Sequence, residues 1–192
     1  MFKINVINDS AQVYTPYNGD FVRRIKNIGG AKWNRDHNCW IIPASAVDAC
    51  REIMRNVYGR CDIADGGKTV KLRLRFTQSL SKTCGDVTLL GKTLCHAYSR
   101  DSGGCPGDDV FYITGAPQSG GSAKYWESVV PSGSTIVLHD VSVDLYKRFI
   151  PEAIPGLTVE QIEDIPNKEK LTKEREKLLE RLNEIDKLLE SM

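Results

Sequence analysis

The stretch YTPYNGDFVRRIKNIGGAKWNRDHNCWIIPASAVDACREIMRNVY, residues 14–58, carries the clearest structural pattern of the chain. Its first part spaces apolar residues at i, i+4 and i+7, as on one helix face, namely Phe21, Ile25 and Ile28. Asn18 or Asp20 can cap this helix, and Gly29-Gly30 is expected to end it. The pattern predicts a short amphipathic helix whose outer face carries three cations, Arg23, Arg24 and Lys26.

A β-hairpin and a second helix are predicted next. Residues 31–33 (AKW) and 39–42 (CWII) are typical of two strands, joined by the polar residues 34–38 as a five-residue loop and stopped by Pro43. In the second helix, Ser45 and Asp48 match a capping box, and Gly59 ends the apolar pattern. The apolar side of that helix is formed by Val47, Cys50, Met54 and Val57.

The order helix, Lys-Trp-Asn, polar turn, Cys-Trp-Ile-Ile-Pro, helix resembles the HARP domain, a small module found beside annealing helicases and in phage-encoded proteins. The matching residues are Val13-Tyr14, Tyr17, Phe21, Ile25, Lys26, Ile28, Lys32-Trp33-Asn34 and Trp40-Ile41-Ile42-Pro43. The resemblance implies binding to nucleic acid, or to a ligand with nucleic-acid-like phosphates, without catalysis by the module. The chain has no Gly-x4-Gly-Lys-Ser/Thr P-loop, which excludes motor activity.

Basic residues are concentrated toward the start of the chain, although the formal net charge of the 192 residues is only +1. Residues 1–60 hold nine Lys or Arg against five Asp or Glu, residues 61–150 ten against nine, and residues 151–192 seven against eleven. A basic first module suits phosphate contact, whereas a nearly neutral chain argues against coating DNA through charge alone. We therefore expect selective binding at a defined site.

The composition, 41% hydrophobic and 27% charged, is that of an ordinary globular protein. Residues 1–6 alternate like a strand and are too short and polar for a signal peptide, and no apolar run reaches membrane-spanning length. We expect a cytoplasmic protein with no membrane partner, in the host-cell cytosol if the chain is phage-encoded.

The six cysteines are expected to be thiols, because no secretory signal is present and Cys39 and Cys50 fall at core positions. A structural zinc site could draw on Cys39, Cys61, Cys84, Cys95, His37 and His96. No Cys-x2-Cys or His-x3-His pair supports such a site. We therefore predict no metal and no cofactor.

A second, β-rich domain is predicted after the turn-like segment 64–67 (ADGG). Apolar and basic residues alternate through residues 70–76 (VKLRLRF), which predicts a strand with one apolar face. The other face carries Lys71, Arg73 and Arg75. It is either a solvated outer surface or a phosphate-binding stripe, since like charges at i, i+2 repel and would benefit from an anionic partner.

Two segments rich in glycine and serine follow strand-like runs, residues 99–104 (SRDSGG) and residues 115–122 (GAPQSGGS). Glycine backbones and serine hydroxyls can cradle a phosphate, and nearby aromatic rings can stack on a base. The alternative is two ordinary turns with the aromatic residues in the core. The predicted nucleotide site comprises Tyr98, Arg100, Asp101, Ser102, Ser119, Gly120, Gly121, Ser122, Lys124 and Trp126.

Recognisable catalytic motifs are absent from the sequence. A serine triad could be drawn from Ser119 or Ser122 with His96 or His139, but no Gly-x-Ser-x-Gly elbow supports it. Asp108-Asp109 and Asp140 could hold a metal, although such acidic residues are commoner in turns. We predict a binding protein rather than a hydrolase or nuclease.

The C-terminal part is predicted to be helical and to assemble copies of the chain. Residues 134–141 predict a strand, residues 145–149 a short helix, and residues 151–166 a proline-containing linker in which Thr158 and Gln161 cap one helical turn. In residues 167–192, a heptad pattern interrupted by Arg175 predicts oligomerisation through Leu171, Leu178, Leu182, Ile185 and Leu189. The alternative is an amphipathic helix packed on its own domain.

Together these patterns predict a non-enzymatic α+β protein with a HARP-like module (1–60), a β-rich ligand-binding domain (66–150), a linker (151–166) and a coiled-coil helix (167–192). The expected ligand carries phosphate, and sequestering a nucleotide signal of a host defence system is the expected role. One alternative is a DNA- or RNA-binding accessory protein that uses Arg23, Lys26, Lys32, Trp33, Trp40, Lys71, Arg73 and Arg75. The other is a direct inhibitor of a host defence protein, such as a CRISPR-type complex.

Overall fold

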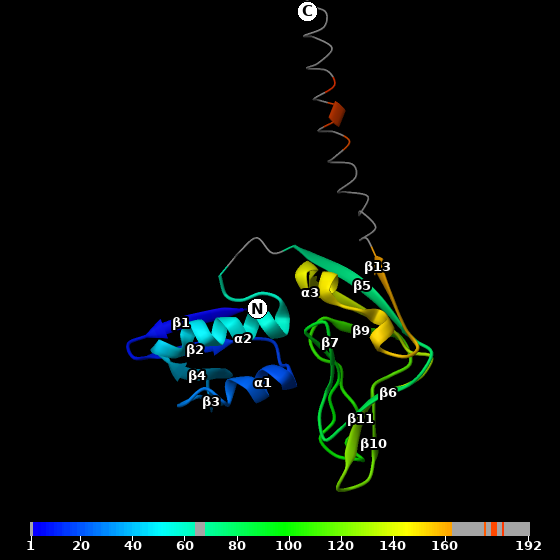
Figure 1. Cartoon of the computed structure of the whole chain (residues 1–192), viewed down its shortest axis with the longest axis horizontal. Helices are drawn as coiled ribbons and strands as arrows, with labels where there is room; N and C mark the ends of the chain where they lie inside the picture. Colours follow the sequence, from blue (N-terminus) through cyan, green and yellow to red (C-terminus); the bar gives the residue numbers. More distant parts are fainter. Residues whose placement is uncertain (1, 64–67, 163–174, 176–177, 180–181, 183–192) are drawn as a thin grey trace, which may run out of the picture. The chain divides into compact units, whose positions relative to one another are not determined.

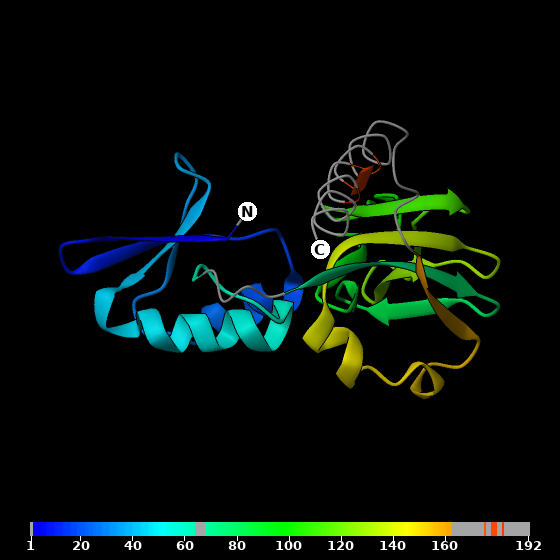
Figure 2. The same ribbon diagram turned by 90° about the horizontal axis from the view of Figure 1, so that it is seen from above.

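The computed structural model describes residues 2–63 and 68–162, together with Arg175, Leu178, Leu179 and Leu182 (Figures 1 and 2). The chain divides into two compact units, residues 1–162 and residues 163–192. The described residues mix strands with helices, in agreement with the predicted α+β class. The first unit contains two clusters of buried apolar side chains, and we call the parts that hold them the N-terminal lobe (residues 2–61) and the β-rich lobe (residues 68–162).

The N-terminal lobe is an antiparallel sheet of order β1-β2-β4-β3 with two helices packed on it. Its strands are β1 (Lys3–Ile7), β2 (Ser10–Tyr14), β3 (Lys32–Asn34) and β4 (Cys39–Pro43), and its helices are α1 (Gly19–Ile25) and α2 (Val47–Tyr58). Figure 2 shows α2 running along one face of the sheet. The side chains between helices and sheet are almost fully buried, among them Val13, Phe21, Ile25, Ile42 and Met54.

Local sequence explains how α1 begins and how α2 ends. Of the two predicted caps, Asn18 is the one used, because its Oδ1 accepts hydrogen bonds from the backbone N–H groups of Asp20 and Phe21 at 2.9 and 3.1 Å. Gly59 follows α2 at φ 72°, the left-handed conformation in which glycine ends a helix without strain. Both ends therefore follow from side-chain and backbone chemistry visible in the sequence.

Three local predictions in this lobe are wrong in detail. The helix α1 ends at Ile25, one turn before the glycine pair. Ser45 does not cap α2, since it lies in a 3-10 turn (Ala44–Ala46) and the cap position is Ala46, which makes no side-chain cap bond. Asn34 pairs with Cys39, so the hairpin loop spans residues 35–38 rather than 34–38.

The β-rich lobe contains a sheet of order β13-β5-β12-β9, a smaller sheet of order β10-β11-β6 and the hairpin β7-β8, all with antiparallel neighbours. The strands are β5 (Thr69–Phe76), β6 (Leu80–Thr83), β7 (Val87–Leu89), β8 (Lys92–Cys95), β9 (Val110–Thr114), β10 (Gln118–Gly121), β11 (Trp126–Val130), β12 (Thr135–Ser142) and β13 (Leu157–Ile162). A short helix, α3 (Val143–Arg148), and a 3-10 turn (Pro151–Ala153) separate β12 from β13.

The predicted alternation in β5 is confirmed. Leu72, Leu74 and Phe76 are buried in the core of this lobe, whereas Arg73 and Arg75 lie on the opposite face. The predicted strand at residues 134–141 and the short helix after it correspond to β12 and α3.

Two segments predicted to be irregular or helical are strands. The helical turn predicted from Thr158 and Gln161 is wrong, because residues 157–162 form β13 and pair with β5, for example Val159 with Leu74. A single helical turn makes few hydrogen bonds, whereas joining an existing sheet satisfies a whole row of them. The predicted linker therefore contributes a strand to the sheet, and the second Gly/Ser segment likewise contains β10. Residues 64–67 and Pro166 lie outside the described residues.

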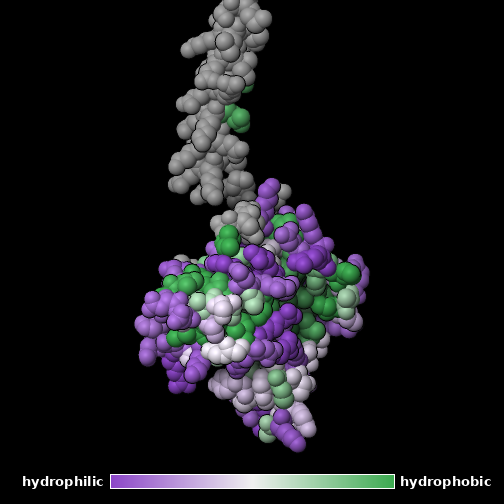
Figure 3. All heavy atoms as spheres, turned by 60° about the vertical axis from the view of Figure 1, so that its left-hand side comes forward, coloured by the Kyte–Doolittle hydropathy of each residue, from purple (hydrophilic) through white to green (hydrophobic). Residues whose placement is uncertain are grey.

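Of the predicted heptad, the structure describes Arg175, Leu178 and Leu182, with Leu179 beside them, and all four are helical and exposed. Leu171, Ile185 and Leu189 lie outside the described residues. Within the described part of the chain, no helix combines the length and the apolar character needed to cross a membrane. On the face seen in Figure 3, hydrophobic side chains are interspersed with hydrophilic ones.

All six cysteines are described, and all are thiols. Cys39 and Cys50 are fully buried, as predicted, and Cys61 and Cys95 are buried with them, whereas Cys84 is exposed. Burial, together with the nearby negative charge of Asp62, raises the pKa of the Cys50 thiol to about 12. This thiol therefore behaves as a small apolar core residue at neutral pH.

Candidate ligand-binding cleft

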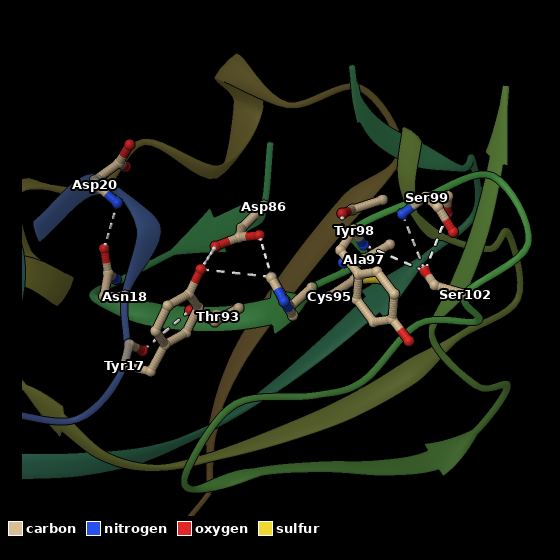
Figure 4. Close-up of polar contacts among 12 residues, drawn as sticks. Tyr17, Asn18, Asp20, Asp86, Thr93, Cys95, Ala97, Tyr98, Ser99 and Ser102 are labelled. Carbon is tan, nitrogen blue, oxygen red and sulfur yellow. Dashed lines mark hydrogen bonds and ion pairs between the residues drawn. The ribbon is translucent and has the colours of Figure 1, made fainter. Parts of the chain in front are cut away.

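Tyr17, Asp86 and His96 meet where the two lobes touch, although they are far apart in the sequence. Tyr17 lies just before α1, Asp86 in the turn between β6 and β7, and His96 directly after β8. The Tyr17 hydroxyl donates a 2.9 Å hydrogen bond to Oδ2 of Asp86, and Nδ1 of His96 lies 2.6 Å from Oδ1 of the same carboxylate (Figure 4). The rings of Tyr17 and His96 also make an edge-to-face contact with centroids 5.2 Å apart.

The buried carboxylate sets the orientation of both partners. The Asp86 side chain is only 6% exposed, and each of its oxygens accepts a hydrogen bond. Because Asp86 engages Nδ1, the ring nitrogen of His96 that remains for a ligand is Nε2, on a side chain that is 38% exposed. Burial, and then the adjacent Asp86 charge, raise the pKa of Tyr17, so its hydroxyl keeps its proton and donates a hydrogen bond to Asp86.

Further contacts hold the start of α1 against the β-rich lobe. The side-chain amide of Asn18 donates to the carbonyl of Gly91, and the Thr93 hydroxyl donates to the carbonyl of Tyr17. A Cβ atom at Gly19 would collide with the Asp86 carboxylate, so only glycine permits this close approach. These contacts and the Tyr17–Asp86 hydrogen bond together hold the segment before α1 against the β-rich lobe.

A cleft of about 620 Å³ opens beside this contact. Helix α1 contributes Arg23 and the residue after the helix, Lys26, while β6 contributes Lys82. His96 lies in the same lining, and two aromatic residues of the β-rich lobe complete it, Tyr98 and Trp126. Tyr98 is 73% exposed, which leaves most of its ring free to contact a ligand. The cleft therefore combines cations with rings.

Asp20 organises the cations on one side of the cleft. It forms a 2.7 Å ion pair with Arg23, lies 3.9 Å from the ammonium of Lys82 and accepts a 2.9 Å hydrogen bond from Thr88. Lys26 makes no ion pair with any of the described residues. The carboxylate of Asp20 thus positions two cations from different lobes, Arg23 and Lys82. Lys26 is the third cation of the cleft lining and could pair with an anionic ligand.

The two Gly/Ser segments of the predicted nucleotide site are brought together, and the hydroxyls of Ser119 and Ser102 both bond to backbone groups of residues 98–103. Ser119 accepts a hydrogen bond from Gly103 N–H and donates to the carbonyl of Arg100. Ser102 accepts from the N–H groups of Tyr98 and Ser99 (Figure 4). These hydrogen bonds stabilise the loops, and the phosphate cradle predicted for them stays a prediction.

Most other residues of that predicted site are also engaged elsewhere. Arg100 pairs with its neighbour Asp101, and this contact raises the pKa of the guanidinium and lowers that of the carboxyl. Ser122 accepts a hydrogen bond from the N–H of Tyr125, and Lys124 lies over the Tyr125 ring. Gly120 and Gly121 are strand residues of β10, paired with β11. Of the predicted nucleotide residues, Tyr98 and Trp126 are the two that line the cleft.

The basic face of β5 lies apart from the cleft lining and is partly neutralised by its neighbour strand. Arg73 and Arg75 contact the carboxylate of Glu160 on β13 at 3.3 and 3.5 Å. Lys71, on the same face, is not among the residues that line the cleft. The first interpretation of this face, an outer surface of the sheet, fits these contacts better than a phosphate stripe.

A second hollow of about 390 Å³ adjoins the cleft and holds part of the predicted nucleic-acid site. Trp33 of β3 and Trp40 of β4 line it and meet edge to face, with ring centroids 5.5 Å apart. Lys26 is the one charged residue in the lining of the hollow, whereas Lys32 lines neither the hollow nor the cleft. Tyr17, Val22 and Lys26 line both the hollow and the cleft.

Three of the other candidate catalytic and metal residues, His139, Asp109 and Asp140, contact side chains outside the cleft lining. His139 packs against Phe111, with ring centroids 4.8 Å apart. Asp109 pairs with Lys92, and Asp140 pairs with Arg60. Among the residues that the structure describes, no group of three or more His, Cys, Asp or Glu side chains is placed to hold a metal ion.

Sequence reasoning missed Asp86, Lys82 and Gly19 as site residues. Asp86 lies in an unremarkable turn, and nothing near it in the sequence indicates a partner 69 residues away. Tyr17 was noted only for its place in the resemblance to the HARP domain. No sequence pattern indicates the contact between Tyr17 and Asp86, because this contact depends on how the two lobes pack against each other.

Comparison with protein-family models, with curated proteins and with solved structures finds no match to this chain. The resemblance to the HARP domain therefore stays a prediction that rests on the residues quoted for it.

Proposed function

We propose that this protein binds a nucleotide, or another small molecule that carries both phosphate and an aromatic ring, in the cleft beside Tyr17 and Asp86. The proposal rests on one observation: basic and aromatic side chains line the same cleft of about 620 Å³. The cations are Arg23, Lys26 and Lys82, and the rings are Tyr98 and Trp126. The volume falls within the range of about 300 to 1,000 Å³ typical of small-molecule sites.

Phosphate fits the cationic side of the cleft. Arg23 and Lys82 already share Asp20, so their charged groups are held near one another before a ligand arrives. A phosphate placed there would receive charge-assisted hydrogen bonds, which are roughly twice as strong as neutral ones. His96, held by Asp86 through Nδ1, leaves Nε2 available to a ligand in the same cleft.

Stacking fits the other side of the cleft. Tyr98 presents a largely exposed ring, and Trp126 is half-buried at the first position of β11. Aromatic residues that expose a ring face beside cations are typical of sites that bind bases without reading their edges. The proposed role is binding without catalysis, and a phage-encoded protein of this kind would sequester a nucleotide signal of a host defence system.

The proposal is tested by native mass spectrometry of the full chain purified from bacterial cells that express a nucleotide-signalling defence system. Release of a nucleotide on denaturation, at a fixed ratio to the protomer, is the expected result. Calorimetric titration of the ligand-free chain with AMP, ADP and ATP measures the same site directly. A chain that releases no nucleotide and binds none of the three would overturn the proposal.

Nucleic-acid binding is the second candidate, and one observation favours it. Trp33 and Lys26, both predicted for that function, line the hollow that adjoins the cleft. A long strand held by many phosphates would show affinity that falls steeply with salt, by a power related to the number of phosphates neutralised. A binding series with single-stranded DNA and RNA between 50 and 200 mM salt, in roughly the range where this effect is large, distinguishes the two candidates.

A further inference from the structure

We propose that the binding site continues from the cleft into the hollow beside Trp33, and that the ligand is a dinucleotide, with two bases joined through phosphate. This inference rests on the proposed function and specifies its ligand. One base would lie against Tyr98 and Trp126, the linking phosphate at Lys26, and the second base in the hollow beside Trp33.

The two spaces share a wall. Tyr17, Val22 and Lys26 line both the cleft of about 620 Å³ and the hollow of about 390 Å³. Each volume falls within the range of a small-molecule site, about 300 to 1,000 Å³. A ligand with a single ring would occupy one space and leave the other to water, whereas two rings on a short linker would occupy both.

The lining of the hollow suits a ring and does not suit a phosphate. Phe21 is fully buried beneath it, Trp40 is 7% exposed, and Trp33 and Tyr17 are each 49% exposed at its rim. The edge contact with Trp40 restrains Trp33 without covering it. A base placed here would gain apolar contact and stacking, whereas a phosphate would lose water and meet only Lys26.

Lys26 occupies the position that a linking phosphate requires. It is the charged residue common to both spaces, and it has no ion pair with any residue between 2 and 63 or 68 and 162. Arg23 and Lys82, the other cations of the cleft lining, are held together by Asp20 and line the cleft alone, whereas Lys26 lines both spaces. An ammonium without a carboxylate partner, between two ring-binding spaces, favours a ligand whose charge lies between its rings.

The test uses AMP and ApA, the dinucleotide of two adenosines joined by one phosphodiester, titrated calorimetrically into the full chain. ApA is expected to bind more tightly than AMP. Trp33→Ala should weaken ApA binding by roughly 5- to 150-fold, the loss of one base stack, while changing AMP affinity by less than about twofold. Phe111→Ala, which removes an aromatic residue of similar exposure outside both spaces, is the matched control and should change neither affinity.

A second readout does not depend on the Trp33 variant folding normally. The chain has three tryptophans, and all of them line one of the two spaces. In Trp126→Phe, the remaining fluorescence comes from Trp33 and Trp40, so ApA should quench it and AMP should not. Lys26→Ala should weaken ApA binding, with Lys32→Ala, an exposed lysine outside both spaces, as its control.

The outcomes separate this inference from the proposed function. If AMP and ApA bind equally and Trp33→Ala changes neither, the dinucleotide inference is wrong while nucleotide binding stands. If a hexanucleotide binds far more tightly than ApA with a steep salt dependence, the ligand is a longer strand and the inference is overturned. If none of these probes binds, both the proposed function and the inference fall.

Discussion

The hydroxyl of Tyr17 donates a 2.9 Å hydrogen bond to the buried carboxylate of Asp86, although the two residues lie 69 positions apart in the chain. This bond joins the N-terminal lobe to the β-rich lobe beside the proposed binding cleft. Both residues line the cleft, so its shape depends on the contact between the lobes. The stability of this contact can therefore be tested separately from ligand binding.

Gly19→Ala is expected to destabilise the fold by about 1–3 kcal/mol, because the added methyl group would collide with the Asp86 carboxylate. Chemical denaturation with urea measures the loss. Gly29→Ala is the matched control, since a Cβ atom there meets no other atom within 4 Å. Equal stability of the two variants would contradict the close packing of Gly19 against the Asp86 carboxylate.

Removing the cleft cations should weaken nucleotide binding, whereas removing the β5 cations should not. The double variant Arg23→Ala, Lys82→Ala loses two charge-assisted contacts, each worth about 1.5–3 kcal/mol, so ATP affinity should fall at least tenfold. Arg73→Ala, Arg75→Ala removes the same number of charges from a face already paired with Glu160. Calorimetric titration measures the ATP affinity of both double variants. If both lose the same affinity, the loss reflects the net charge of the protein rather than contacts in the cleft.

The ion pair between Arg51 and Asp62 should make stability depend on pH in the acid range. Two contacts of 2.9 and 3.0 Å join the guanidinium to both carboxylate oxygens, and this hydrogen bonding lowers the pKa of Asp62. The unfolded-state carboxyl has a pKa of about 3.9, so the stabilisation is complete above that pH and is lost as pH falls through the lower folded-state pKa. Denaturation midpoints measured from pH 6 downward should show the decrease.

Asp62→Asn isolates this contribution. It should destabilise the protein at pH 7 by about 1–3 kcal/mol and flatten the acid dependence. Asp48→Asn is the matched control, because Asp48 binds the same Arg51 at 3.1 Å with a side chain that is 96% exposed, and such pairs contribute less than about 1 kcal/mol. If both variants lose the same stability, the partly buried pair of Arg51 with Asp62 contributes no more than the exposed pair of Arg51 with Asp48.

Truncation after Pro166 should reduce the molar mass to that of a monomer if the heptad residues assemble copies of the chain. Leu178 and Leu182, both heptad positions, are 63% and 56% exposed, which leaves apolar surface for a partner helix. Light scattering during size-exclusion chromatography measures the mass. Leu178→Asp with Leu182→Asp in the full chain is the less drastic variant and should give the same result. A mass unchanged after correction for the deleted residues would remove the prediction of oligomerisation.

The sequence by itself determined the elements whose cause is local. Asn18 caps α1, Gly59 ends α2, and the alternation in residues 70–76 orients β5, because each depends on the spacing of side chains within a few residues. The same reasoning predicted that Tyr98, Trp126, Arg23 and Lys26 contact a ligand. It assigned them to separate sites, because spacing carries no information on which distant segments meet.

Tertiary structure decided the strand β13 and the composition of the cleft. The segment with Thr158 and Gln161 has a helical capping pattern, yet pairing with β5 satisfies its backbone over six residues. Asp86 and Lys82 join α1 only because the lobes pack together, and the hydroxyl of Ser119 from the predicted cradle bonds to the backbone of the other Gly/Ser loop. These outcomes depend on contacts between residues far apart in the chain, whose energies no local pattern encodes.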